Sequence, residues 1–211
     1  SQGSSVRLMI IVRLERLPAG KGIPALCRLV RYEKSSMLSR QAALIVLAYR
    51  KGTAARRRAV EEAIREVLDH SKRPAVQWLL TWFHYRNEPA ELARQWIPLI
   101  GAEESLLQTS PNETSRDIIS SLLTLLLDRL TELKDWEAVN VVAERFAKPI
   151  GENPMCLYSL ATAQASQGDA AQAAKTAQRA LEFKSGSQVD ALLQHLAVGM
   201  ELQQHGQYRW A

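Results

Sequence analysis

Cysteine is the scarcest residue of the chain, with only Cys27 and Cys156 among 211 residues. Two cysteines cannot build a disulfide framework or a four-cysteine zinc site, and their low number favours a reducing compartment, so we expect a cytoplasmic protein. Glycine and proline are also few, with 10 and 8 residues, whereas 46% of the residues are hydrophobic. This composition excludes collagen-like and intrinsically disordered chains and indicates a globular protein.

Long apolar runs and short catalytic motifs are missing as well. Charged residues interrupt the apolar segment 6–17, and the segment 118–127 is shorter than the roughly 20 residues that span a bilayer, so no transmembrane helix is predicted. The chain has no glycine-rich phosphate loop, and its histidines lack the spacing of a zinc protease. The sequence therefore predicts no catalytic, metal-binding or cofactor-binding residue, and no enzyme.

Charge is divided unevenly along the chain. Residues 1–100 hold 18 Lys and Arg against 8 Asp and Glu, whereas residues 101–211 hold 9 against 14. The two parts carry formal charges of +10 and −5, which indicates either an acidic partner for the first part or a solvated basic face.

The densest run of positive charge is Arg56, Arg57 and Arg58, at the start of an expected helix. This basic patch could contact nucleic-acid phosphates. Glu61 and Glu62 follow Arg57 and Arg58 at a spacing of four, so ion pairs along a solvated helix are the simpler interpretation. Nucleic-acid binding by the basic part remains the alternative.

The sequence predicts an all-helical chain. Between the glycine and proline clusters, such as residues 18–24, 98–101 and 149–154, strong helix formers predominate and apolar residues recur at helical spacing. Pro89, and Thr114 with an acidic residue three positions later, indicate helix starts. The expected apolar faces of segments 53–70 and 170–183 are Ala59, Ala63, Ile64, Val67 and Leu68, and Ala173, Ala177, Ala180 and Leu181.

Aromatic residues make up only 6% of the chain but gather in the segment 78–96. Such a cluster could form a ligand platform, yet two of its tryptophans lie four apart on one helical face. We therefore expect them to pack in the core against the helix at residues 92–99. The cluster consists of Trp78, Trp82, Phe83, Tyr85 and Trp96.

The spacing of residues 157–185 resembles a tetratricopeptide repeat, a family in which a tight turn joins two antiparallel helices. Gln164, Ala177 and Ser185 depart from the usual Tyr, Phe and Pro. The matching positions are Leu157 at the usual Trp, Leu160-Ala161 at the Leu-Gly pair, Gly168-Asp169 at the turn, and Ala173 and Ala180 at the two alanines.

A second unit of this kind is predicted one period of the family earlier in the chain, a distance of about 34 residues. Lys134-Asp135-Trp136 would form the turn that corresponds to Gly168-Asp169-Ala170. The helices on either side of this turn would contribute Leu126, Leu127 and Leu130, and Val139, Ala143 and Phe146.

A third unit would follow from Val198 and stop at Ala211, inside its second helix. Because a repeat unit cannot bury its apolar face without a neighbour, we expect the chain to be part of a longer protein. An uncovered face of Val198, Leu202 and Tyr208 would favour self-association.

Residues 22–50 resemble a HEAT-type helical hairpin, with a polar turn at residues 33–36. The chain is thus expected to be a right-handed α-solenoid of stacked antiparallel helix pairs. Residues 6–110 would be basic and HEAT-like or irregular, and residues 111–211 would be tetratricopeptide-like with a truncated last unit.

The expected function is a non-catalytic scaffold that binds a protein or peptide. A coat-like or regulatory solenoid of a larger membrane-associated or enzymatic protein is a further alternative, beside the nucleic-acid-binding module. The resemblance places Met155, Tyr158, Thr162 and Ser166 on the hollow side of the array, as a candidate partner-binding face. Family members that clamp a terminal carboxylate use Lys, Arg and Asn there, which the helix at residues 154–167 lacks.

Overall fold

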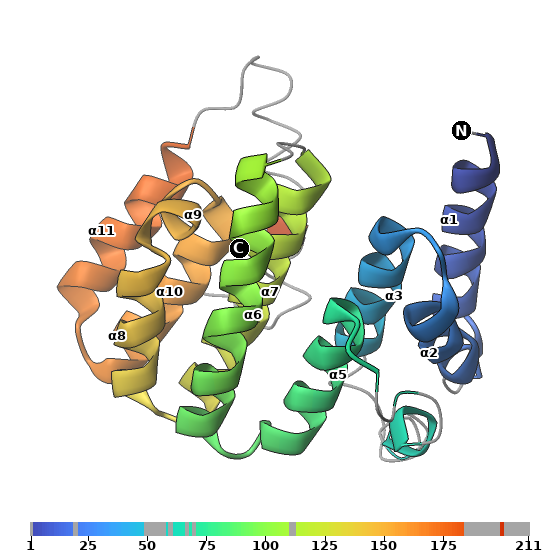
Figure 1. Cartoon of the computed structure of the whole chain (residues 1–211). Coiled ribbons are helices and arrows are strands. Elements are labelled where there is room, and N and C mark those ends of the chain that lie inside the picture. Colours follow the sequence, from blue (N-terminus) through green and yellow to red (C-terminus); the bar gives the residue numbers. More distant parts are fainter. Residues whose placement is uncertain are drawn as a thin grey trace. The chain divides into compact units, whose positions relative to one another are not determined.

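The fold is all-α. A computed structural model describes residues 2–18, 21–48, 58, 61–65, 68, 71–109, 113–183 and 199–200. These residues form helices and their connections, with no strand among them, so the prediction of an all-helical chain is confirmed for this part. The chain divides into two compact units, Ser1–Ile118 and Ile119–Ala211, whose helices are labelled in Figure 1.

The first unit places its helices in sequence order around an aliphatic and aromatic core. Residues 58, 61–65 and 68 are also helical and lie between α3 and α5 in the chain. The helices of this unit are α1 (Gln2–Glu15), α2 (Ile23–Tyr32), α3 (Ser36–Ala48), α5 (Pro74–Tyr85) and α6 (Pro89–Thr109).

Helices α2 and α3 lie in the segment predicted to form a helical hairpin, and they pack against each other on either side of a short turn. The turn lies at Glu33 to Ser35, where the Glu33 Oε1 atom accepts a hydrogen bond from the Ser35 backbone N–H at 2.9 Å. Ser39 donates to the Val30 carbonyl at 2.6 Å and joins the two helices through a buried contact. The residues that the hairpin buries include Ile23, Leu26, Cys27, Val30, Leu38, Ala42, Ala43, Val46 and Leu47.

A close backbone approach fixes the position of α1 beside α2. A Cβ atom on Gly22 would collide with the Leu14 carbonyl group, so only glycine fits there. The chain can therefore turn back from α1 into α2 within a few residues.

The three tryptophans of the aromatic cluster lie in the core of the first unit, as predicted, whereas Phe83 and Tyr85 are half-buried. Trp78, Trp82 and Trp96 are almost completely buried, and the ring centroids of Trp82 and Trp96 lie 4.8 Å apart at 51°. The Trp96 indole N–H donates to the Thr81 hydroxyl at 3.0 Å. This bond joins α5 to α6 and satisfies the only polar atom of the Trp96 side chain.

One predicted helix break is wrong. Helix α6 continues through the expected break at residues 98–101, although Pro98 supplies no backbone N–H. Buried Trp96 and Ile100 hold it in the core on both sides of the proline. Helix α7 (Glu113–Glu132) begins within one residue of the start predicted at Thr114.

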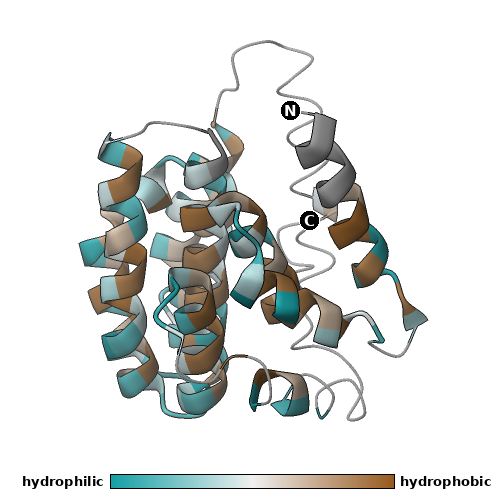
Figure 2. Cartoon of the chain, turned by 45° about the vertical axis from the view of Figure 1, so that its right-hand side comes forward, coloured by the Kyte–Doolittle hydropathy of each residue, from teal (hydrophilic) through white to brown (hydrophobic). Residues whose placement is uncertain are grey.

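The second unit contains most of α7 and four further helices. In Figure 2 its helices show hydrophobic and hydrophilic residues in alternation along their length, as expected when one side of a helix is buried. The further helices are α8 (Trp136–Arg145), α9 (Ala147–Gly151), α10 (Pro154–Gln167) and α11 (Ala170–Leu181).

The turns before α8 and α11 have the same hydrogen-bond pattern. Lys134 and Gly168 have φ angles of 59° and 100°, in the left-handed region. The next residue, Asp135 or Asp169, donates its backbone N–H to the carbonyl five residues earlier, at 3.1 and 3.0 Å. Its carboxylate then accepts from the N–H three residues later, at 2.9 and 3.0 Å. Each turn thus combines a Schellman ending with an aspartate N-cap.

Small residues line the buried side of α11. Ala173, Ala177 and Ala180 are buried as predicted, but Leu181 is 53% exposed and its expected burial is wrong. Leu181 is the last residue of α11, whereas Thr176, in the middle of the helix, is buried beside the alanines.

The residues predicted for the preceding unit are also mostly buried. Ala143 is half-buried. The buried members of that set are Leu126, Leu127, Leu130, Val139 and Phe146. The residues proposed for a third unit, Val198, Leu202, Tyr208 and Ala211, lie outside the described residues.

Candidate functional site

The predicted partner-binding face lies along α10. This helix starts after Asn153, whose side chain accepts a hydrogen bond from the Cys156 backbone N–H at 3.1 Å. Proline at its first position suits a helix start because the missing N–H has no helical partner there. The local sequence therefore fixes the beginning of the helix that carries all four predicted residues.

The structure divides these four residues. Ser166 is exposed and Thr162 is half-buried, with its hydroxyl donating to the Tyr158 carbonyl at 2.9 Å. Met155 and Tyr158 are only 7% and 3% exposed, so their expected position on an open face is wrong. Burial raises the pKa of the Tyr158 hydroxyl, since it disfavours the phenolate.

The reason is that α10 is the central helix of the second unit. It packs against α8, α9 and α11. It is also tied to α7, because the Ser159 hydroxyl donates to the Asp128 carboxylate at 2.9 Å and the Cys156 thiol to the Ser120 carbonyl at 3.4 Å. A helix with neighbours on several sides buries apolar residues around much of its circumference.

The predicted basic patch is described only in part. Arg58 is helical and exposed, whereas Arg56 and Arg57 lie outside the described residues. Glu61, expected to pair along its own helix, has an ion pair with Arg86 beyond the end of α5 at 2.6 Å. The first unit therefore uses this carboxylate to join two separate segments.

Several other arginines of the first unit also bind protein groups. Arg40 pairs with the buried Glu103 at 3.0 Å. Arg73 donates to the carbonyls of Arg31 and Glu33, at the end of α2. The cations that stay exposed include Arg13, Arg16, Lys21, Arg28, Lys34, Arg58, Arg65 and Lys72.

A cavity of about 590 Å³ adjoins the ion pair of Glu61 and Arg86. The Arg86 guanidinium lies 5.4 Å from the centre of the Phe83 ring, in cation–π geometry. Ile64, Arg65 and His84 are further lining residues. The positive charge of Arg86 is thus balanced by a carboxylate and stacked on an aromatic ring.

A second cavity, of about 630 Å³, lies at the turn between α10 and α11. Four amide side chains and one carboxylate line it, and we call it the amide pocket. Sequence reasoning missed this pocket, although Gln164 was visible as a departure from the pattern that residues 157–185 resemble. Its lining residues are Asn140, Gln164, Gln167, Gly168, Asp169 and Gln172.

Cys27 and the possible metal ligands are the described groups that bear most directly on reactive chemistry. Burial raises the pKa of the Cys27 thiol to about 12, so this cysteine supplies no thiolate at neutral pH. Within the described ranges, no group of three or more His, Cys, Asp or Glu residues could hold a metal ion. No helix in the same ranges is both long and apolar enough to cross a membrane.

Comparison of the chain with family models, curated proteins and solved structures gives no match.

Proposed function

We propose that the chain is a right-handed α-solenoid, HEAT-like in the first unit and tetratricopeptide-like in the second, that serves as a non-catalytic protein-binding scaffold. The observation that supports this proposal is the repetition of one turn at the period of the tetratricopeptide family. Lys134-Asp135 and Gly168-Asp169 have the same backbone bonds and the same cap. A repeated turn at the family's period is what a tandem array of helix pairs requires.

The physical argument for a scaffold is the kind of surface that such an array offers. Stacked helix pairs bury their apolar sides against neighbours and expose a long polar surface without a deep apolar pocket. The amide pocket and the side of α10 that carries the half-buried Thr162 and the exposed Ser166 are polar surfaces of this kind. The function inferred from the fold rests on analogy, so it needs a direct binding test.

The test is selection of peptides from a random displayed library on the immobilised full chain. We expect enriched peptides with a shared pattern, which bind the chain in solution with saturable affinity. Ala173→Arg, which should separate α10 from α11, serves as the control and should lose this binding. A library that yields no saturable ligand after repeated selection would contradict the scaffold proposal.

Nucleic-acid binding by the first unit is the second candidate, and its exposed cations favour it. Arg13, Arg16 and Arg28 are exposed, as is Arg58 of the predicted patch. The test is fluorescence anisotropy of a labelled single-stranded RNA over a series of salt concentrations. Binding that weakens steeply with salt, and weakens further in a variant with these four arginines changed to glutamine, would support this candidate. Salt-insensitive or absent binding would exclude it.

A further inference from the structure

The amide pocket is lined by Gln164, whose buried side-chain acceptor has no donor in the described part of the chain. Among the described residues, the Oε1 atom of Gln164 has no hydrogen-bond partner although it is inaccessible to solvent. A buried polar atom without a partner costs roughly 1 to 3 kcal/mol, so a ligand that donates to it would recover that free energy. The cavity of about 630 Å³ is within the usual size of ligand sites.

The equivalent turn shows that this glutamine is not needed for folding. Leu130 stands in the first turn where Gln164 stands in the second, since the carbonyl of each accepts the N–H of the aspartate five residues later. Leu130 is fully buried. The same backbone therefore accommodates a buried leucine at this position.

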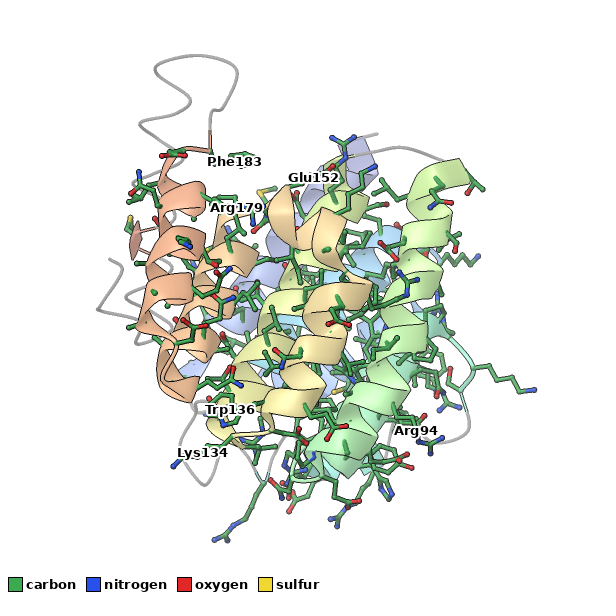
Figure 3. All side chains as sticks on the ribbon, turned by 90° about the vertical axis from the view of Figure 1, so that its left-hand side faces the viewer. Arg94, Lys134, Trp136, Glu152, Arg179 and Phe183 are labelled. Carbon is green, nitrogen blue, oxygen red and sulfur yellow. The ribbon has the colours of Figure 1, made fainter. Side chains whose placement is uncertain are left out.

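The charges around the turn favour a cation. Asp169 lines the pocket, and its Oδ1 atom already accepts the Gln172 backbone N–H at 3.0 Å. At the start of α8, the helix that contributes Asn140 to the pocket, Asp135 and Glu137 outnumber the neighbouring cation Lys134. Figure 3 shows Lys134 and Trp136 at the end of the second unit where α8 begins, and Glu152, Arg179 and Phe183 at the opposite end.

We propose that the amide pocket binds the guanidinium group of an arginine in a protein partner. A guanidinium group has five N–H donors in a planar fork and no acceptor, which complements a set of amide oxygens beside a carboxylate. The Gln164 side chain turns outward to bring its buried Oε1 atom to one of these donors, and Asp169 provides the charge. This inference rests on the proposed function, because it names the chemistry that a scaffold partner would present.

The test is a titration of the ¹⁵N-labelled full chain with a capped Ala-Arg-Ala peptide, followed by NMR. The same peptide with citrulline has the same shape without the charge, and serves as the comparison ligand. We expect the arginine peptide to shift the resonances of residues 164–172 and to bind at least tenfold more tightly than the citrulline peptide.

Two variants locate the binding in the pocket. Gln164→Leu should fold like the wild type and weaken arginine binding at least tenfold. Asp169→Asn keeps a residue that caps helices but removes the charge, so it should weaken arginine binding and leave citrulline binding unchanged. Gln178→Leu, on the outer side of α11 where Gln178 bonds Glu182, should bind like the wild type.

Three results would overturn the inference: no shift at residues 164–172, equal affinity for both peptides, or arginine binding that both pocket variants retain. The library selection separates this failure from failure of the scaffold proposal. Selected peptides that lack arginine and bind Gln164→Leu as tightly as the wild type would contradict the arginine-binding pocket and still support the scaffold proposal.

Discussion

The two units are stabilised by interactions of different sequence range. In the first unit, charged side chains connect distant segments, as when Arg40 pairs with Glu103 or Arg73 binds the end of α2. In the second unit, Asp135, Asn153 and Asp169 each accept the N–H three residues later. Local caps leave a sequence signature that long-range ion pairs do not, so the second unit is the easier one to predict.

The largest expected effect is in the second unit, at Ala173. Its side chain is fully buried beside those of Ala177 and Ala180. Ala173→Arg would have to bury a charge or push α11 away from α10, and we expect it to lower the free energy of unfolding by about 4 kcal/mol. Chemical denaturation followed by circular dichroism measures this loss.

Ala174→Arg is the matched control, since Ala174 is the next residue of α11 and is exposed. It introduces the same charge into the same helix and should change the free energy of unfolding by less than about 0.5 kcal/mol. Equal effects of the two variants would contradict the packing of α11 on its alanine stripe.

The next largest effect is in the first unit, at the ion pair of Arg40 and Glu103. The side chains are 13% and 3% exposed, so Glu103→Ala leaves a largely buried guanidinium without its carboxylate. We expect a loss of about 2 to 3 kcal/mol in the free energy of unfolding. Glu103→Gln keeps an acceptor for Arg40 and should lower the free energy of unfolding clearly less than Glu103→Ala does.

The same residue should make the stability of the first unit depend on pH. Burial raises the pKa of the Glu103 carboxyl, and Arg40 offsets this only in part. The folded state then holds this proton at pH values where the unfolded state has released it, so stability falls as pH rises from the ordinary value through the raised one. As the pH rises from about 4 to about 8, we expect the free energy of unfolding of Glu103→Gln to increase progressively relative to that of the wild type. A constant difference across this range would contradict the raised pKa.

Sequence patterns predicted those parts of the fold that depend on neighbouring residues. Helical spacing located the buried alanines of α11, and the two Asp turns followed from residues one repeat period apart. Pro98 shows the limit of this reasoning, because core packing of α6 overrides a local break. Met155 and Tyr158 were misplaced for the same reason, since the neighbours that surround α10 come from other parts of the chain.

The candidate site was less predictable than the fold. The unusual Gln164 was visible in the sequence, but only the fold shows that its side-chain oxygen is buried without a partner among the described residues and that Asn140 and Gln172 come from other helices to line the same cavity. Likewise, the sequence gives no sign that Arg73 differs from a surface cation, and only the fold shows that it binds carbonyl groups at the end of α2. Composition reports how many charges a region has, and only the fold determines which of them are paired.

The smallest predicted effects compare the two equivalent turns directly. Gly168 has a φ of 100° and no atom within 4 Å of where a Cβ would lie, so Gly168→Ala changes the backbone preference without a steric clash. We expect it to lower the free energy of unfolding by about 1 kcal/mol.

At the other turn, Lys134 has a left-handed φ of 59° although it is not a glycine. Lys134→Gly relieves that cost but makes the unfolded chain more flexible, so the net gain should be about 0.5 kcal/mol. Lys175→Gly removes the same charge from an exposed position inside α11 and should instead cost about 0.5 to 1 kcal/mol. Denaturant titrations of the three variants resolve these opposite signs, and a loss at Lys134→Gly as large as that at Lys175→Gly would show that the two turns are not equivalent.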